Sequence, residues 1–155
     1  MFRKATLLLA TGFGLGLCPF ASGTAGTLLG IPIALAAARF NWLRQAAGAA
    51  VLILLAVPVC GVAEKVFGIK DDGRIVADEY LTFPLCVVGL PLIEAPWLIA
   101  SAFAMHRLAD VVKPPPARGI QSVRGGWGIV LDDVIASLYA LVLNHGIWLA
   151  VKTWL

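Results

Sequence analysis

The chain has 155 residues, of which 60% are hydrophobic and 14% charged, and its formal net charge is only +3. Soluble domains are nearer ~45–50% apolar and about 25% charged, so this composition excludes an ordinary soluble globule. It favours a single membrane domain covering residues 1–155. The basic residues are scattered along the chain, which argues against nucleic-acid binding and fits attraction to anionic lipid headgroups.

The N-terminal half begins with basic residues and an apolar run that superficially resemble a signal peptide. The run continues to Pro19 without a small-residue cleavage site, so we expect it to be retained. Residues 27–38 form a short apolar helix. Residues 45–63 carry no charge over nineteen positions, which is about the length needed to cross a ~30 Å hydrocarbon core.

Residues 85–105 are long enough for another span, but Gly89, Pro91 and Pro96 interrupt them. Proline removes a backbone donor and crowds the preceding turn, so a broken helical hairpin is expected here. Residues 134–151 then form a second span, with Asn144 and His145 as its polar interruptions. The pattern predicts an all-α, multi-pass integral membrane domain with two or three spanning helices and a broken helical hairpin.

Three polar, glycine- and proline-containing stretches separate these helices: residues 12–26, 64–82 and 106–133. If the hairpin does not cross the membrane, all three stretches converge as irregular loops on one face. Most basic residues would then lie on that face, which the positive-inside rule assigns to the cytoplasm.

Two acidic pairs, Asp78-Glu79 and Asp132-Asp133, lie within apolar runs. A buried carboxylate needs a paired cation or a metal ion, and oxygen ligands suit Mg²⁺. The pairs therefore predict a metal site that also activates water. The alternative is that each pair caps a helix N-terminus at the membrane interface, where the helix dipole favours acids.

Arg107, Asp110 and Lys113 recur every three residues and so share one face of a helix that Pro114 ends. This face predicts phosphate capture, with Asp110 orienting a basic side chain or binding metal. The alternative is a salt-bridge ladder at the end of a helix.

The stretch Ser22-Gly23-Thr24-Ala25-Gly26-Thr27 enters a helix and would offer backbone N–H groups and hydroxyls to an anion. The spacing of Gly26 and Gly30 has an alternative interpretation, in which two small residues only let helices approach closely. Asp71-Asp72-Gly73 is interpreted as a turn.

The order of four motifs resembles the phosphatidylglycerophosphatase A family. The motifs are Ser22–Thr27, then Ile75-Val76-x-Asp78-Glu79, then Arg107-x-x-Asp110-x-x-Lys113-Pro114-x-Pro116, then Gly125-Gly126-x-Gly128-Ile129-x-x-Asp132-Asp133. The resemblance implies a Mg²⁺-dependent enzyme of the bacterial inner membrane that converts phosphatidylglycerophosphate to phosphatidylglycerol and inorganic phosphate. The chain departs from the family pattern at Thr82-Phe83, Ala117 and Ser137, which we interpret as packing positions.

We therefore expect three sets of site residues. The metal ligands are Asp78, Glu79, Asp132 and Asp133. Asp110 joins these four as a catalytic residue. The phosphate-binding residues are Arg107, Lys113, Ser22, Gly23, Thr24, Gly26 and Thr27. A small cation-binding transport protein would explain the acidic pairs equally well, but it leaves the Arg107 and Lys113 face without a role. The oligomeric state is not predicted.

Overall fold

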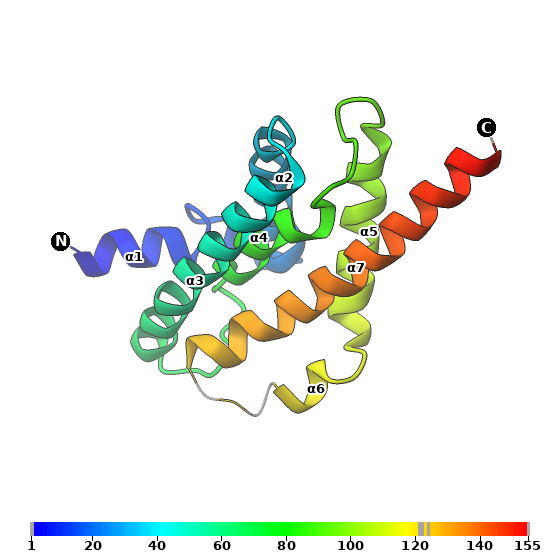
Figure 1. Ribbon diagram of the computed structural model, residues 1–155. Helices are drawn as coiled ribbons and strands as arrows, with labels where there is room; N and C mark the ends of the chain where they lie inside the picture. The colour runs from blue at the N-terminus through cyan, green and yellow to red at the C-terminus, as the bar shows by residue number, and fades with distance from the viewer. Residues whose placement is uncertain (1, 121–122, 124, 155) are drawn as a thin grey trace.

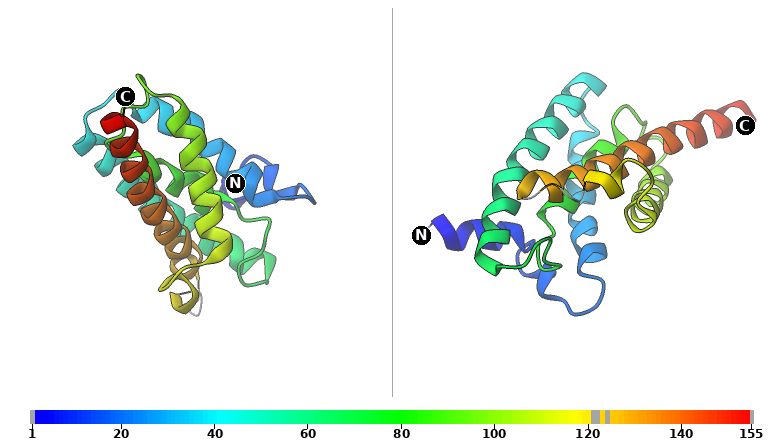
Figure 2. Two further views of the ribbon diagram at one scale, coloured as in Figure 1. Left: turned by 90° about the vertical axis from the view of Figure 1, so that its right-hand side faces the viewer. Right: turned by 90° about the horizontal axis from the view of Figure 1, so that it is seen from below.

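The computed structural model describes residues 2–120, 123 and 125–154, and within these ranges all regular structure is helical (Figure 1). The elements in chain order are α1 (Phe2–Ala10), the 3₁₀ helix η1 (Leu15–Leu17), α2 (Ser22–Ala37), α3 (Trp42–Phe67), α4 (Ala77–Thr82), the 3₁₀ helix η2 (Phe83–Val87), α5 (Trp97–Val112), α6 (Ala117–Ile120) and α7 (Gly126–Trp154). The two termini point away from the bundle on opposite sides (Figures 1 and 2). The all-helical prediction is confirmed for the described residues.

Helices α3 and α7, with 26 and 29 residues, are long and apolar enough to cross a membrane. Only 22% of the most apolar window of each helix is buried inside the protein, so these are not the core helices of a soluble domain. Their exposed apolar surface indicates association with a membrane. The two helices contain the spans expected at residues 45–63 and 134–151 and pack against each other.

Helix α7 begins eight residues before the expected span, so Asp132 and Asp133 lie on a helix. The expectation of an irregular loop up to Asp133 is therefore wrong. Close packing explains the early start: a Cβ added at Gly126 would lie 1.9 Å from the Val57 carbonyl oxygen of α3. The backbone of α7 approaches α3 this closely only because residue 126 is a glycine.

The segment after α4 is not one continuous helix. Between η2 and α5 the chain is non-helical, and Gly89 there adopts a positive φ of 78°. The Gly89 N–H donates to the Gln45 side-chain oxygen at 2.8 Å, which fixes the turn to the start of α3. Pro96 immediately precedes α5. These interruptions coincide with the Gly and Pro positions that weaken a helix.

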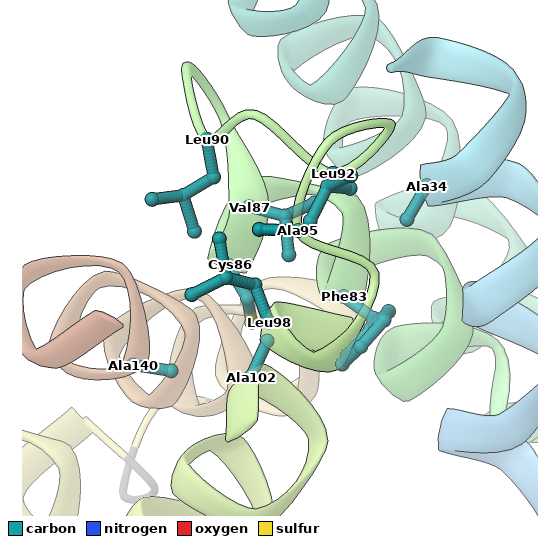
Figure 3. Close-up of a cluster of buried hydrophobic side chains, with 10 residues drawn as sticks. All are labelled: Ala34, Phe83, Cys86, Val87, Leu90, Leu92, Ala95, Leu98, Ala102 and Ala140. Carbon is teal, nitrogen blue, oxygen red and sulfur yellow. The ribbon is translucent and has the colours of Figure 1, made fainter. Parts of the chain in front are cut away.

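A buried apolar cluster holds η2, the following turn and α5 against α2 and α7 (Figure 3). Phe83, Leu98 and Ala102 are fully buried in it. Ser101 of α5 donates a hydrogen bond to Asn144 of α7 at 2.7 Å, so the polar residue expected in the second span links two helices. This cluster joins η2, which follows α4 directly, to the first half of α5 and the middle of α7.

The positions that depart from the family pattern are buried as expected of packing sites. Thr82, Phe83 and Ser137 have no exposed surface, and Ala117 is nearly as buried. The Ser137 hydroxyl donates to the Thr82 carbonyl at 3.3 Å, so two of the departures contact each other. The substitutions at these positions are therefore accommodated by contacts within the helix bundle.

Gly30→Ala is expected to destabilise the protein by about 1–3 kcal/mol, because a new Cβ would lie 2.6 Å from the Phe83 Cβ in the packed core. Gly48→Ala is the matched control. Among the described residues, no atom beyond the adjoining backbone of its own helix lies within 4 Å of its Cβ position, so this change should be neutral or slightly stabilising. Thermal unfolding in detergent measures both. Equal unfolding temperatures for the two variants would contradict the close packing of α2 on η2.

Candidate active site

A cavity of about 180 Å³ lies where the first turn of α2, the α3–α4 connection, α4, the end of α5 and the start of α7 meet. Its described lining residues are Ser22, Asp71, Gly73, Ile75, Asp78, Glu79, Asp110, Lys113, Ile129, Asp132 and Asp133. The three polar stretches of the sequence thus converge. Six carboxylates and one lysine line the cavity, so its charge is strongly negative unless cations or protons enter.

Asp78 and Asp133 form the buried centre of this cluster. They are only 6% and 5% exposed, and their carboxyl groups lie within hydrogen-bonding reach of each other. One oxygen of each, Oδ1, has no hydrogen-bond partner. Burial raises the pKa of Asp78 well above its usual range, and the neighbouring Glu79 carboxylate raises it further. Two adjacent buried carboxylates with unpartnered oxygens need a shared proton or a cation.

Glu79 lies beside this centre and links three elements. Its Oε2 accepts hydrogen bonds from Thr27 of α2 at 2.9 Å and Arg107 of α5 at 3.2 Å. The same Arg107 nitrogen, Nη1, lies 2.9 Å from Asp110 Oδ2. Burial raises the pKa of Glu79 to about 7, against the opposing effect of Arg107. The predicted Arg107–Asp110 face is therefore an i,i+3 ion pair that also holds Glu79.

Lys113 pairs with Asp132 across the cavity. Lys113 ends α5 in a left-handed conformation with φ of 50°, immediately before Pro114. This turn takes Lys113 off the helix and toward the start of α7. The four predicted metal ligands therefore fall into two kinds: Asp78 and Asp133 are paired with each other, and Glu79 and Asp132 are paired with cations.

The Ser22–Thr27 stretch forms the first turns of α2. Ser22 lines the cavity, while Thr27 is buried and binds Glu79. A Cβ at Gly23 would lie 2.2 Å from Glu79 Oε1, and one at Gly26 would lie 2.6 Å from Val76 Cβ. Gly23 and Gly26 therefore allow α2 to approach α4, as the close-packing interpretation requires. Thr24 is half-buried and is not among the described residues that line the cavity.

Two residues near the centre were missed by sequence reasoning. Asp71 was interpreted as part of a turn, yet it lines the cavity, and its neighbour Asp72 makes the turn by pairing with Arg74 at 2.6 Å. His106 is fully buried, and its Nε2 lies 3.9 Å from Asp133 Oδ1 with neither ring nitrogen hydrogen-bonded. The available signals were that His106 directly precedes Arg107 and that Asp71 lies in the same polar stretch as Asp78, seven residues before it.

The cavity presents carboxylate oxygens that are potential ligands of a metal ion. Among the described residues, no group of three or more His, Cys, Asp or Glu side chains encloses a possible metal position. Asp78 and Asp133 nevertheless present two unpartnered carboxylate oxygens at the cavity. Mg²⁺ commonly binds through one or two carboxylates and keeps several waters, so these residues fit it.

Thr27→Val is expected to lower activity by about tenfold with little loss of folded protein, because it removes a hydrogen bond to the charged Glu79 side chain. Thr153→Val is the control, since the Thr153 hydroxyl bonds only to carbonyls of its own helix at an exposed position. Turnover and unfolding temperature are measured together. A variant with wild-type turnover would show that the Thr27–Glu79 bond does not contribute to the reaction.

The fold and the cavity define an all-helical, membrane-associated protein with a buried cluster of carboxylates. The family model described as Phosphatidylglycerophosphatase A matches residues 8–148. The chain belongs to this family, and it is a phosphatase.

Curated relatives agree with this assignment. The chain is 35% identical to a protein of Escherichia coli named phosphatidylglycerophosphatase A, over 84% of this chain and 76% of the relative. It is 35% identical to the protein of that name in Haemophilus influenzae, over 90% and 86%. It is 34% identical to a putative phosphatidylinositol-3-phosphatase of Bacteroides thetaiotaomicron, over 96% and 93%. No solved structure was found to match the chain.

Proposed function

We propose that this protein hydrolyses the terminal phosphomonoester of phosphatidylglycerophosphate, giving phosphatidylglycerol and inorganic phosphate. The family and two of the relatives carry this activity in their names. The observation that carries the proposal is that the Asp78–Asp133 pair and Lys113 line one cavity, while Arg107 is held beside it by the cavity-lining Glu79 and Asp110. Family membership favours this enzyme over the cation-binding transport protein that the acidic pairs alone would allow.

Mg²⁺ is the proposed cofactor, with Asp78 and Asp133 as its ligands. The other two predicted ligands, Glu79 and Asp132, are already paired with Arg107 and Lys113. The support is electrostatic. A phosphomonoester dianion would be repelled by six carboxylates that face only one lysine among the described lining residues. A bound Mg²⁺ would supply positive charge opposite the phosphate oxygens.

The chain's own residues would perform the remaining steps. Arg107 and Lys113 hold the phosphate oxygens, and Asp110 orients Arg107. The oxygen of a water molecule attacks phosphorus, the bond from phosphorus to the glycerol oxygen breaks, and that oxygen takes up a proton. Glu79, whose pKa is raised to about 7, is suited to accept the proton of the water and return it to the leaving oxygen.

Phosphatidylinositol 3-phosphate is a second candidate substrate. The Bacteroides relative, which is as similar to this chain as the other two, carries that substrate in its name. The test is phosphate release by purified protein in mixed micelles with phosphatidylglycerophosphate, phosphatidylinositol 3-phosphate or phosphatidate. We expect the highest kcat/KM with phosphatidylglycerophosphate. Faster turnover of the inositol lipid would reassign the headgroup, and absence of turnover with all three would contradict a lipid phosphatase.

We further propose a multi-pass arrangement in the bacterial inner membrane with the cavity facing the cytoplasm. The broken segment between η2 and α5 would enter the membrane and return to the same face. Its support is that Asp78, before the break, and Asp110, after it, line one cavity. The scattered basic residues at this end of the helices give the orientation.

Cysteines introduced at Ile69 and Arg118 are expected to react from the cytoplasmic side with a membrane-impermeant thiol reagent. Both positions are exposed at the cavity end, and the background lacks Cys18, Cys60 and Cys86. An Arg39→Cys variant, exposed at the end of α2 away from the cavity, should react only from the opposite side. Labelling of positions 69 and 118 from opposite sides would mean that the segment crosses the membrane.

A further inference from the structure

The first part of the stretch 12–26, which was expected to be polar, is apolar. This connection between α1 and α2, residues 11–21, carries an exposed surface that the proposed chemistry does not use. The chain contains no Asp, Glu, Lys, Arg or His between Ala5 and Ala38. Within the connection, Phe13, Leu17 and Phe20 are 64%, 63% and 82% exposed. Connections that face water are rarely so apolar, so this surface requires an apolar environment.

Most backbone N–H groups of this connection are hydrogen-bonded to nearby carbonyls. All eight N–H groups from Thr11 to Cys18 donate to carbonyls within residues 7–15, although only η1 in this stretch is helical. The Thr11 hydroxyl also donates to the Leu7 carbonyl at 2.9 Å, and Pro19 has no N–H. Eight of the ten backbone N–H groups in residues 11–21 therefore donate to nearby carbonyls, which lowers the cost of placing the loop in the apolar boundary region of a leaflet.

The connection is fixed to the wall of the cavity. The Val76 N–H donates to the Ala10 carbonyl at 2.8 Å, and the Tyr80 hydroxyl donates to the Leu9 carbonyl at 3.0 Å. A Cβ at Gly16 would lie 2.2 Å from the Arg74 carbonyl oxygen, so η1 packs directly on the α3–α4 connection. The end of α1 and the loop therefore pack directly against residues 74–80, the segment that contains the cavity-lining Asp78 and Glu79.

The apolar surface begins close to the cavity opening. Phe20 precedes the cavity-lining Ser22 by two residues, a separation of at most about 7 Å along the chain. A phospholipid whose terminal phosphate enters the cavity must leave its acyl chains outside, because the cavity of about 180 Å³ holds only a headgroup portion. The nearest exposed apolar surface along the chain from Ser22 is this loop.

We propose that residues 11–21 insert into the membrane leaflet and bind the acyl chains of the phospholipid substrate while its phosphate lies in the cavity. The choice of a phosphorylated phospholipid as the occupant rests on the proposed function. Insertion of the loop into the bilayer does not depend on that function. Insertion and acyl-chain binding can therefore be tested separately.

Cys18 provides a probe of insertion that needs no introduced cysteine. It is exposed in the loop, whereas Cys60 and Cys86 are buried. A spin label on Cys18 in reconstituted bilayers is expected to collide readily with oxygen and poorly with a water-soluble nickel chelate. The control label, on an Arg118→Cys variant lacking Cys18, should show the reverse. Equal nickel accessibility at positions 18 and 118 would overturn insertion, whatever the activity of the protein.

Phe20→Ser tests binding of the substrate chains, with Phe40→Ser as a matched control. Phe40 is 53% exposed, but it lies between α2 and α3 at the other end of the helices. Phe20→Ser should raise KM for long-chain phosphatidylglycerophosphate by about tenfold, because the lost apolar contact contributes to substrate binding. It should leave kcat unchanged, and kcat/KM for a water-soluble dihexanoyl substrate should also be unchanged. Phe40→Ser should change none of these values.

Two results would overturn the acyl-chain assignment. Equal losses with the long-chain and dihexanoyl substrates would mean that Phe20 supports the structure of the cavity. An unchanged KM for the long-chain lipid would mean that the loop contacts only the surrounding bilayer or a second copy of the chain. If the wild-type protein hydrolyses neither substrate, the proposed function fails, and the Cys18 measurement still decides insertion.

Discussion

Removal of divalent cations from the purified protein is expected to abolish phosphate release, and added Mg²⁺ is expected to restore it. The cavity brings six carboxylates together, and one oxygen each of Asp78 and Asp133 has no partner. Without a cation, a phosphate dianion is repelled at the position where it must react. Loss of several kcal/mol of charge stabilisation corresponds to a rate decrease of about a thousandfold or more.

A binding measurement separates metal affinity from activity. Mg²⁺ should raise the unfolding temperature of the wild-type protein, because a ligand that binds only the folded state stabilises it. The increase should be lost in Asp78→Asn and Asp133→Asn. Lys70→Gln, an exposed change at the same end of the helices, should retain it. Full turnover in the presence of a chelator would remove the metal from the mechanism.

Arg107→Lys is expected to lower kcat/KM by about a hundredfold while the protein still folds. The Arg107 guanidinium contacts Glu79 at 3.2 Å and Asp110 at 2.9 Å, and the proposal requires it also to bind a phosphate oxygen. Lysine keeps the charge but has no planar fork, so it cannot satisfy these partners together.

The control for this change is Arg118→Lys, because Arg118 is exposed and its side chain donates only to the Val112 carbonyl among the bonds that the structure describes. Its activity should remain at the wild-type level. If Arg107→Lys instead loses folded protein and activity in equal proportion, the role of the arginine is structural, as in the salt-bridge ladder that the i,i+3 spacing of Arg107 and Asp110 allows.

The long helices could be predicted because their signal is local. Nineteen charge-free residues at positions 45–63 predict a helix long and apolar enough to cross a membrane, and α3 contains them. The start of α7 could not be predicted in the same way. Gly126 and Gly128 are weak helix formers, and their place in α7 depends on contacts with the distant Val57 and the preceding Val123.

Most of the residues that line the cavity could be predicted from the sequence, but the way they pair with one another could not. The position of Asp78, Glu79, Asp132 and Asp133 within apolar runs predicts residues that need cations, and all four line the cavity. Sequence spacing does not reveal that Glu79 pairs with Arg107 and Asp132 with Lys113. It also does not reveal that Asp78 and Asp133 each keep one oxygen without a partner. Asp71 and His106 join the cluster only through the packing of the α3–α4 connection and of α5.

The most direct test of the account is a quantitative conversion assay with purified protein, phosphatidylglycerophosphate and Mg²⁺. The wild-type protein should release inorganic phosphate and phosphatidylglycerol in a one-to-one ratio. Asp78→Asn, shown to be folded by circular dichroism, should release neither, because it removes half of the carboxylate pair at the centre of the cavity. Conversion by Asp78→Asn at the wild-type rate would contradict the site, and absence of conversion by the wild-type protein would contradict the function.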